Sequence, residues 1–282
     1  MIYDIFPFFN ELDILELRLR MLQDVVGHTI IVQSDETHSG LPKPLYFHPT
    51  DARWLPWAGK ISTVVVPSIP HAKSRWVREN AARHIMADAL VGADDHDLAI
   101  ISDVDEIPDS VVLRSCIPQV VGDQWVGFSA WCAYYYLNLW IPTPYPCIAL
   151  ARVGTVRALG AQAIRNQKTH PPIGPVLGGW HFTFMGGVAA IQEKLAAFAH
   201  EEYDTDEMKD PAWIAHHIAI HKIPQRGKWR YLYPSKLSSL PLEVQRHPDR
   251  YAHLLLPETV HGPVYLFPVP RPITGCHGGP AS

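Results

Sequence analysis

The sequence has few cysteines. The four present are Cys116, Cys132, Cys147 and Cys276, and no two of them are spaced as a CxxC pair. This absence excludes a zinc ribbon and a thioredoxin-type redox motif. We therefore expect buried, reduced thiols of the kind that is usual in the cytosol.

The sequence also lacks an excess of basic residues. Lysine and arginine total 24 while aspartate and glutamate total 28, so the formal net charge is −4. This balance provides no general attraction to nucleic acid or to anionic lipid. The 282 residues, 47% of them apolar, are enough for one large globular domain and exclude a wholly disordered chain.

A targeting or membrane segment is not evident. Met1 is followed by Ile2–Phe6, which is typical of a strand and not of a signal peptide. The segment Trp125–Ala151 carries no charge and is long enough to span a bilayer. Its prolines at 142, 144 and 146 and its many aromatic residues favour strands and loops instead. We therefore predict a cytoplasmic protein without a membrane span.

The first part of the chain alternates strand and helix patterns. We expect strands at 2–8, 29–33, 61–66 and 98–101, helices at 11–22 and 75–90, and a loop at 35–56. The strand Leu98–Ile101 is apolar on both faces, as occurs where helices cover both sides of a parallel sheet. This alternation predicts an α/β fold with a Rossmann-like sheet over roughly the first 120 residues.

The second part is mixed. We expect a strand and turn at 125–139, a strand at 178–185, and helices at 188–199 and 213–223. Residues 263–282 are dense in proline and glycine, so we expect a poorly ordered tail after a single domain at 1–262.

The strongest chemical signal follows the fourth strand, in Ser102-Asp103-Val104-Asp105-Glu106. In extended backbone Asp103 and Asp105 point the same way, at the edge where open α/β sheets bind ligands. Two carboxylates on one side repel unless a cation or a proton lies between them. Their oxygens suit Mg²⁺ or Mn²⁺, which bridge carboxylates and substrate phosphates. The alternative is a solvated acidic turn before a helix that Asp109 caps.

Two enzyme classes use such a D-x-D motif. One is a sugar-nucleotide glycosyltransferase, in which the pair holds a cation on the diphosphate. The other is a haloacid-dehalogenase-type phosphohydrolase, with Asp103 as nucleophile and Asp105 as acid or base. That second class carries the motif on its first strand, so the position here favours the transferase. A non-catalytic sugar-binding module is a third alternative.

Several blocks of the chain resemble glycosyltransferase family 17, the family of the β-1,4-mannosyl-glycoprotein 4-β-N-acetylglucosaminyltransferases. In order they are Tyr3-Asp4 with 9–19, 31–34 with 37–40 and 42–45, 76–79 with Arg83, 101–108, 179–182, and 194–195 with 198–202. The resemblance runs over roughly residues 2–225. It implies a GT-A fold, a nucleotide-sugar donor, Mn²⁺ or Mg²⁺, and inversion at the anomeric carbon.

The resemblance also suggests that the two halves of the domain bind different substrates. Residues 1–120 would form the nucleotide-sugar-binding half and residues 121–262 the acceptor-side half. We expect a UDP-sugar donor, most simply UDP-N-acetylglucosamine, and a glycan or glycoconjugate acceptor.

Candidate site residues follow from these expectations. For the metal they are Asp103 and Asp105, completed by His181 or His200; for the donor they are Asn10, Glu11, Lys43, Arg78, Arg83 and Asp103. Arginine offers a planar fork that matches phosphate. Arg78 could instead pair with Glu79 structurally, and Asn10 or Glu11 could cap the first helix.

The acceptor side supplies the remaining candidates. Inversion in one displacement needs a carboxylate to take the acceptor's proton, and Glu201 and Glu202 are available for it. Trp131, Tyr135 and Trp180 could bind the apolar faces of an acceptor sugar. The alternatives are an acidic helix end for the glutamates and core packing for the aromatic residues.

Overall fold

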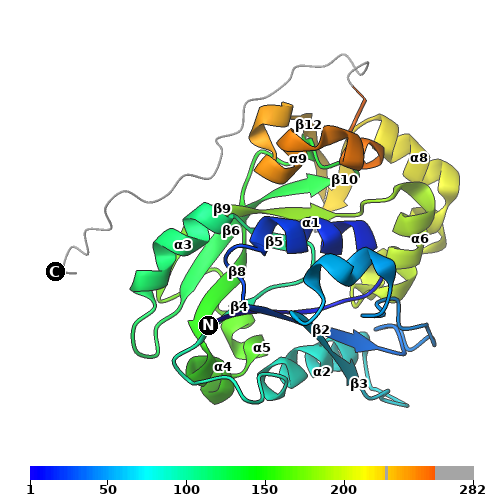
Figure 1. Ribbon diagram of the computed structural model, residues 1–282. Coiled ribbons are helices and arrows are strands. Elements are labelled where there is room, and N and C mark those ends of the chain that lie inside the picture. The colour runs from blue at the N-terminus through cyan, green and yellow to red at the C-terminus, as the bar shows by residue number, and fades with distance from the viewer. Residues whose placement is uncertain (226–227, 258–282) are drawn as a thin grey trace.

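The computed structural model describes residues 1–225 and 228–257 (Figure 1). Its described residues form a central sheet of 10 strands in the order β12-β7-β6-β8-β4-β1-β2-β3, in which β9 pairs with β6 and β5 with β9. The tail predicted at 263–282, the boundary at 262 and Cys276 lie outside the described residues.

The first half contains the predicted parallel strands and the helices between them. These elements are β1 (Ile2–Pro7), α1 (Leu12–Leu22), β2 (His28–Ser34), η1 (Ala52–Trp57), β3 (Ile61–Val66), α2 (Arg75–Asp88) and β4 (Leu98–Ile101). β1 lies between β2 and β4 and is parallel to both, and β3 continues the sheet beside β2. The predicted Rossmann-like alternation is confirmed.

The second half adds strands with both antiparallel and parallel pairings, which make the sheet mixed. They are β5 (Glu106–Pro108), β6 (Val126–Tyr134), β7 (Leu139–Trp140), β8 (Tyr145–Arg152), β9 (Ile173–Thr183) and β12 (Tyr233–Pro234). The charge-free segment at 125–151 forms β6, β7 and β8, and most of it is buried within the sheet. Within the described ranges, no helix has the length and apolar character to cross a membrane.

Shorter elements surround these strands. They are α3 (Ser110–Cys116), α4 (Val153–Leu159), α5 (Ala161–Asn166), α6 (Gly187–Ala197), η3 (Glu201–Tyr203), α7 (Asp206–Lys209), α8 (Pro211–Ala219), the hairpin β10 (Lys222–Gln225) and β11 (Lys228–Tyr231), α9 (Leu242–Arg246) and η5 (Pro248–Leu254). The helix predicted over 213–223 is wrong at its end. It stops at Ala219, His221 takes a left-handed φ of 53°, and Ile223 precedes a proline that disfavours helix.

Helices cover both faces of the sheet, as Figure 1 shows. α1, α3 and α9 pack on one face, and α2, α4 and α5 on the other. In β4, Ile100 faces the first layer while Ala99 and Ile101 face the second. This is a single-domain α/β fold with a mixed sheet flanked by helices, consistent with the GT-A type. β4 lies between β8 and β1, and the loop that follows it is at the carboxyl end of the parallel strands.

The described cysteines agree with the prediction made for them. Cys116, Cys132 and Cys147 are buried and free of disulfides.

Candidate active site

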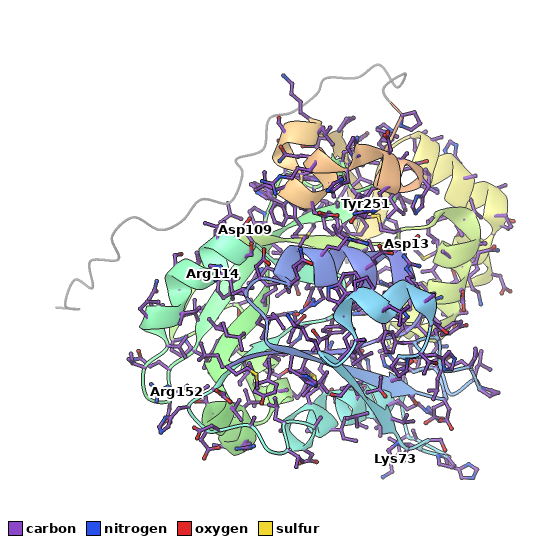
Figure 2. All side chains as sticks on the ribbon, in the orientation of Figure 1. Asp13, Lys73, Asp109, Arg114, Arg152 and Tyr251 are labelled. Carbon is purple, nitrogen blue, oxygen red and sulfur yellow. The ribbon has the colours of Figure 1, made fainter. Side chains whose placement is uncertain are left out.

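The loop after β4 is a tight turn that closes on itself. The backbone N–H of Asp103 donates to the Glu106 carboxylate at 2.7 Å, and the N–H of Glu106 donates to the carbonyl of Asp103 at 3.0 Å. Asp109 (Figure 2) caps the N-terminus of α3, where its carboxylate accepts from the N–H groups of Val111 and Val112, both at 2.9 Å. The carboxylates of the D-x-D motif are therefore not needed to cap α3.

A buried arginine of α1 stabilises this turn by hydrogen bonds to its backbone. Arg18 Nη1 donates to the carbonyl oxygens of Asp103, Val104 and Glu106 at 2.9, 3.2 and 2.9 Å. The rest of its guanidinium pairs with Asp4 of β1. The conformation of the motif thus depends on the first strand and the first helix.

Asp103 lies between two arginines. Arg83 Nη2 of α2 is 3.1 Å from each carboxylate oxygen, and Arg165 Nη2 of α5 is 2.9 Å from Oδ2. Arg165 also pairs with the buried Glu106. Burial disfavours the charged form of Asp103, but Arg165 and Arg83 outweigh it and hold its pKa well below the usual range. Asp103 is therefore ionised at neutral pH.

Asp105 has a different set of cations. Lys194 Nζ of α6 lies 3.0 Å from its Oδ2 and 3.4 Å from Glu11 Oε1, and His181 Nε2 of β9 lies 3.6 Å from Oδ2. The other ring nitrogen of His181 is 3.8 Å from Cys132 Sγ. Burial opposes the charged imidazole, yet Asp105 raises the pKa of His181 well above its ordinary value. We therefore treat His181 as protonated.

The predicted donor residues divide into two groups. We call the linked side chains of the site the charged cluster: Glu11, Arg83, Asp103, Asp105, Glu106, Arg165, His181 and Lys194. Glu11, Arg83 and Asp103 are thus in this cluster, and the backbone N–H of Asn10 donates to the Glu11 carboxylate at 3.2 Å. Arg78 pairs with Glu36 at 3.2 Å and not with the alternative partner, Glu79.

Lys43 lines a pocket beside this cluster. The pocket has a volume of about 200 Å³, and Phe9, Tyr46 and Glu193 contribute to its wall. The ammonium of Lys43 is 5.4 Å from the centre of the Phe9 ring and 5.5 Å from that of Tyr46. Burial lowers the pKa of Lys43, and the nearby carboxylate of Glu11 opposes that shift. Because Glu11 belongs to the charged cluster, the pocket lies near that cluster.

The predicted ligand His200 lies with other partners. Its Nδ1 is 2.8 Å from Glu202, and both side chains are well exposed. The structure thus brings His181, and not His200, to Asp105. The candidate bases Glu201 and Glu202 lie in η3, next to this histidine.

A line of aromatic rings connects the loop that carries His200 to the charged cluster. Lys194 Nζ lies 5.7 Å from the centre of the Phe184 ring, and ring centres then follow at 6.2 Å for Phe184 and Phe198, 5.6 Å for Phe198 and His200, and 4.9 Å for His200 and Trp76. Trp76, at the start of α2, is 41% exposed. We call Phe184, Phe198, His200 and Trp76 the aromatic rim.

The three aromatic residues predicted to bind an acceptor are in the core. Trp131, Tyr135 and Trp180 are 5%, 7% and 1% exposed. Trp131 stacks on Trp140 with 5.9 Å between ring centres, and the hydroxyl of Tyr135 donates to the carbonyl of Lys222. The alternative interpretation, core packing, is the one that the structure supports.

The side chains at the D-x-D motif do not fit a divalent cation as they are arranged. Within residues 1–225 and 228–257, no group of three or more His, Cys, Asp or Glu side chains is placed to hold a metal. Asp103 already accepts from Arg83 and Arg165, and Asp105 from Lys194. Mg²⁺ needs oxygens at about 2.0–2.1 Å in a near-octahedral shell. The expected Mn²⁺ or Mg²⁺ stays a prediction that this arrangement does not favour.

Sequence reasoning missed two of the site's cations. Arg165 lies in a short helix with no recognisable motif, and its role follows only from the fold. Lys194 lies in one of the blocks that resemble the family, but that resemblance assigned it no role. Glu106, to which the sequence assigns no definite role, is the buried partner of Arg165.

Comparison with known proteins bears on the first half of the site. The model of glycosyltransferase family 17 matches residues 1–122, and no curated protein matches the chain. The match includes β1 to β4 and the D-x-D motif, but not His181, Lys194 or the loop at 198–202. Over residues 1–122 the resemblance to glycosyltransferase family 17 is therefore confirmed, and the match supports a glycosyltransferase.

Proposed function

We propose that this protein is an inverting glycosyltransferase that moves a sugar from a nucleotide-diphosphate donor to a glycan hydroxyl. The carrying observation is the position of Asp103 and Asp105. They follow a strand buried on both faces, at the ligand-binding edge of the sheet, and inside the range that the family model matches. The resemblance favours UDP-N-acetylglucosamine as the donor.

The cations of the cluster are suited to the leaving group. Negative charge grows on the diphosphate as the glycosidic bond breaks, and fixed positive groups stabilise that charge. Arg83, Arg165 and Lys194 are held in place by Asp103, Glu106 and their neighbours before any ligand arrives. Such preorganised groups need little rearrangement during the reaction.

We place the nucleoside of the donor in the pocket beside Lys43. Phe9 and Tyr46 supply ring faces for a base, and Lys43 supplies a charge toward the phosphates. A nucleoside there would leave its diphosphate near Lys194, because Lys194 pairs with Glu11 and the Glu11 charge acts on Lys43 in the pocket wall.

We place the acceptor along the aromatic rim. Exposed rings such as Trp76 can cover the apolar face of a sugar, and the rim leads to the Lys194 side of the cluster. Glu201 and Glu202 stay the candidate bases, because both are carboxylates on the loop that carries His200.

Thermal unfolding with a panel of UDP-, GDP- and CMP-sugars tests this proposal. A UDP-sugar should raise the unfolding midpoint of the wild type but not of Asp103→Ala. Asp249→Ala, at an exposed position in η5, is the matched control and should keep the shift. Phosphate release from a phosphomonoester without nucleotide binding would instead favour the phosphohydrolase. Glycan binding without turnover would favour the sugar-binding module.

A further inference from the structure

Lys194 bridges two carboxylates of the site. Its Nζ is 3.0 Å from Asp105 and 3.4 Å from Glu11. We infer that this protein binds its nucleotide-diphosphate donor without a divalent cation, because Lys194, Arg83 and Arg165 supply the positive charge. This inference rests on the proposed function and replaces the metal expected from the resemblance.

Each carboxylate around the D-x-D turn already has a cationic partner. The pairs are Glu11 with Lys194, Asp103 with Arg83 and Arg165, Asp105 with Lys194, and Glu106 with Arg165. The repulsion between neighbouring carboxylates, which suggested a metal from the sequence, is therefore relieved by the protein itself.

The cations are not free to move aside. The side chains of Arg165 and Arg83 are 7% and 10% exposed, and each bridges two acidic groups. Lys194 is 20% exposed and is followed in α6 by the buried Leu195. Displacing any of them would leave a buried charge without its partner, which is costly. The arrangement therefore favours protein cations over an exchangeable ion.

The cluster also keeps a donor for a ligand. The buried Nε of Arg83 has no hydrogen-bond partner among the described residues, whereas buried polar groups are nearly always paired. An oxygen of the donor's diphosphate could accept from it. The side chains of Asp103 and Lys194, 30% and 20% exposed, show that the cluster is not sealed from solvent.

The first test measures Mn²⁺ alone. Electron paramagnetic resonance of free Mn²⁺ is followed as the full-length protein is added without nucleotide. The wild type should leave the signal unchanged, whereas Lys194→Met, which frees Glu11 and Asp105 from their cation, should take up Mn²⁺. Lys60→Met, an exposed lysine before β3, is the matched control and should behave as the wild type. Tight binding of Mn²⁺ by the wild type at this turn, lost in Asp105→Asn, would overturn the inference.

The second test measures the donor. Calorimetric titration of UDP and of UDP-N-acetylglucosamine is done in chelator and in Mn²⁺. The inference expects dissociation constants that agree within about twofold, with Lys194→Met weakened at least tenfold in chelator and the matched control Lys60→Met close to wild type. Affinity that depends on Mn²⁺ by tenfold or more would overturn the inference and leave the transferase proposal standing.

The two tests separate the two proposals. If no nucleotide binds under either condition, the proposed function fails. The Mn²⁺ titration of wild type and Lys194→Met still decides whether the turn is a metal site. A folded state for each variant is checked by its circular dichroism spectrum and its unfolding midpoint.

Discussion

Arg18 and Asp4 form a buried ion pair beneath the candidate active site. Nε and Nη2 of Arg18 donate to the two oxygens of Asp4 at 2.8 and 2.6 Å, and the side chains are 0% and 1% exposed. The third nitrogen of the same guanidinium binds the carbonyls of the D-x-D turn. One side chain of α1 therefore joins the first strand to the loop that follows the fourth.

Arg18→Met should be strongly destabilising. It leaves Asp4 as a buried, unpaired charge, and breaking such a pair costs about 3–5 kcal/mol. Denaturation in urea measures the change in the free energy of unfolding. The double variant Arg18→Met, Asp4→Leu removes both charges and should lose much less than the two single variants together. A loss below about 1 kcal/mol in Arg18→Met would contradict this account.

Gly179→Ala should destabilise the pairing of β5 with β9. A Cβ there would lie 2.7 Å from the carbonyl oxygen of Ile107 and 3.1 Å from Ile148 Cδ1. Overpacking of this kind costs about 1–3 kcal/mol. His181 lies two residues further along β9 and is opposite Glu106 in the pairing of the two strands, so donor binding should weaken as well. Val121→Ala, at an exposed position, is the control, and equal unfolding energies for the two variants would refute the steric argument.

Local patterns predict the sheet because its strands carry their own signals. Leu98–Ile101 is apolar at every position and is buried from both sides, so composition alone indicates a strand that helices cover on both faces. The spacing of Leu12, Leu15 and Leu19 likewise predicts α1. The end of α8 was missed because a left-handed residue, His221, stops the helix where the apolar pattern continues.

Local sequence patterns do not predict the charged cluster. Asp103 was found because its motif is local, but Arg165 is 62 residues away in the chain and Lys194 is 89 residues from Asp105. No periodicity links such partners, and a D-x-D motif predicts a cation without saying whether a metal or a side chain provides it. Composition likewise does not distinguish an aromatic residue of the core from one that binds a sugar, and Trp180, predicted for the acceptor, is buried.

Trp76→Ala should weaken the acceptor and leave the donor unaffected. Trp76 is exposed on the aromatic rim and meets His200 edge to face. Loss of one ring against a sugar costs on the order of 1 kcal/mol, which raises the acceptor KM about five- to tenfold. Val77→Ala, the next residue of α2 and 39% exposed, is the matched control. An equal loss of donor affinity in Trp76→Ala would place this residue on the donor side.

Arg53→Met should lower stability at neutral pH but not in acid. Arg53 donates to Asp13 at 2.6 Å and to Glu16 at 2.7 Å, which ties η1 to α1. Burial acts to raise the pKa of both carboxyls, but their hydrogen bonds to arginine outweigh it and lower both from 3.8 and 4.5. A lowered folded-state pKa gives stability that is complete above the unfolded-state value and is lost as the pH falls through the folded-state value.

The expected difference between wild type and Arg53→Met follows from these signs. The groups are partly exposed, so at pH 7 the variant should lose only about 0.5–1 kcal/mol. Unfolding midpoints taken from about pH 7 downward should converge as the pH falls below the lowered folded-state pKa values, where protonation removes the partners of Arg53. A gap that stays constant over this range would show that Arg53 acts by packing on Trp54, whose ring centre lies 5.1 Å from its guanidinium, and not by charge.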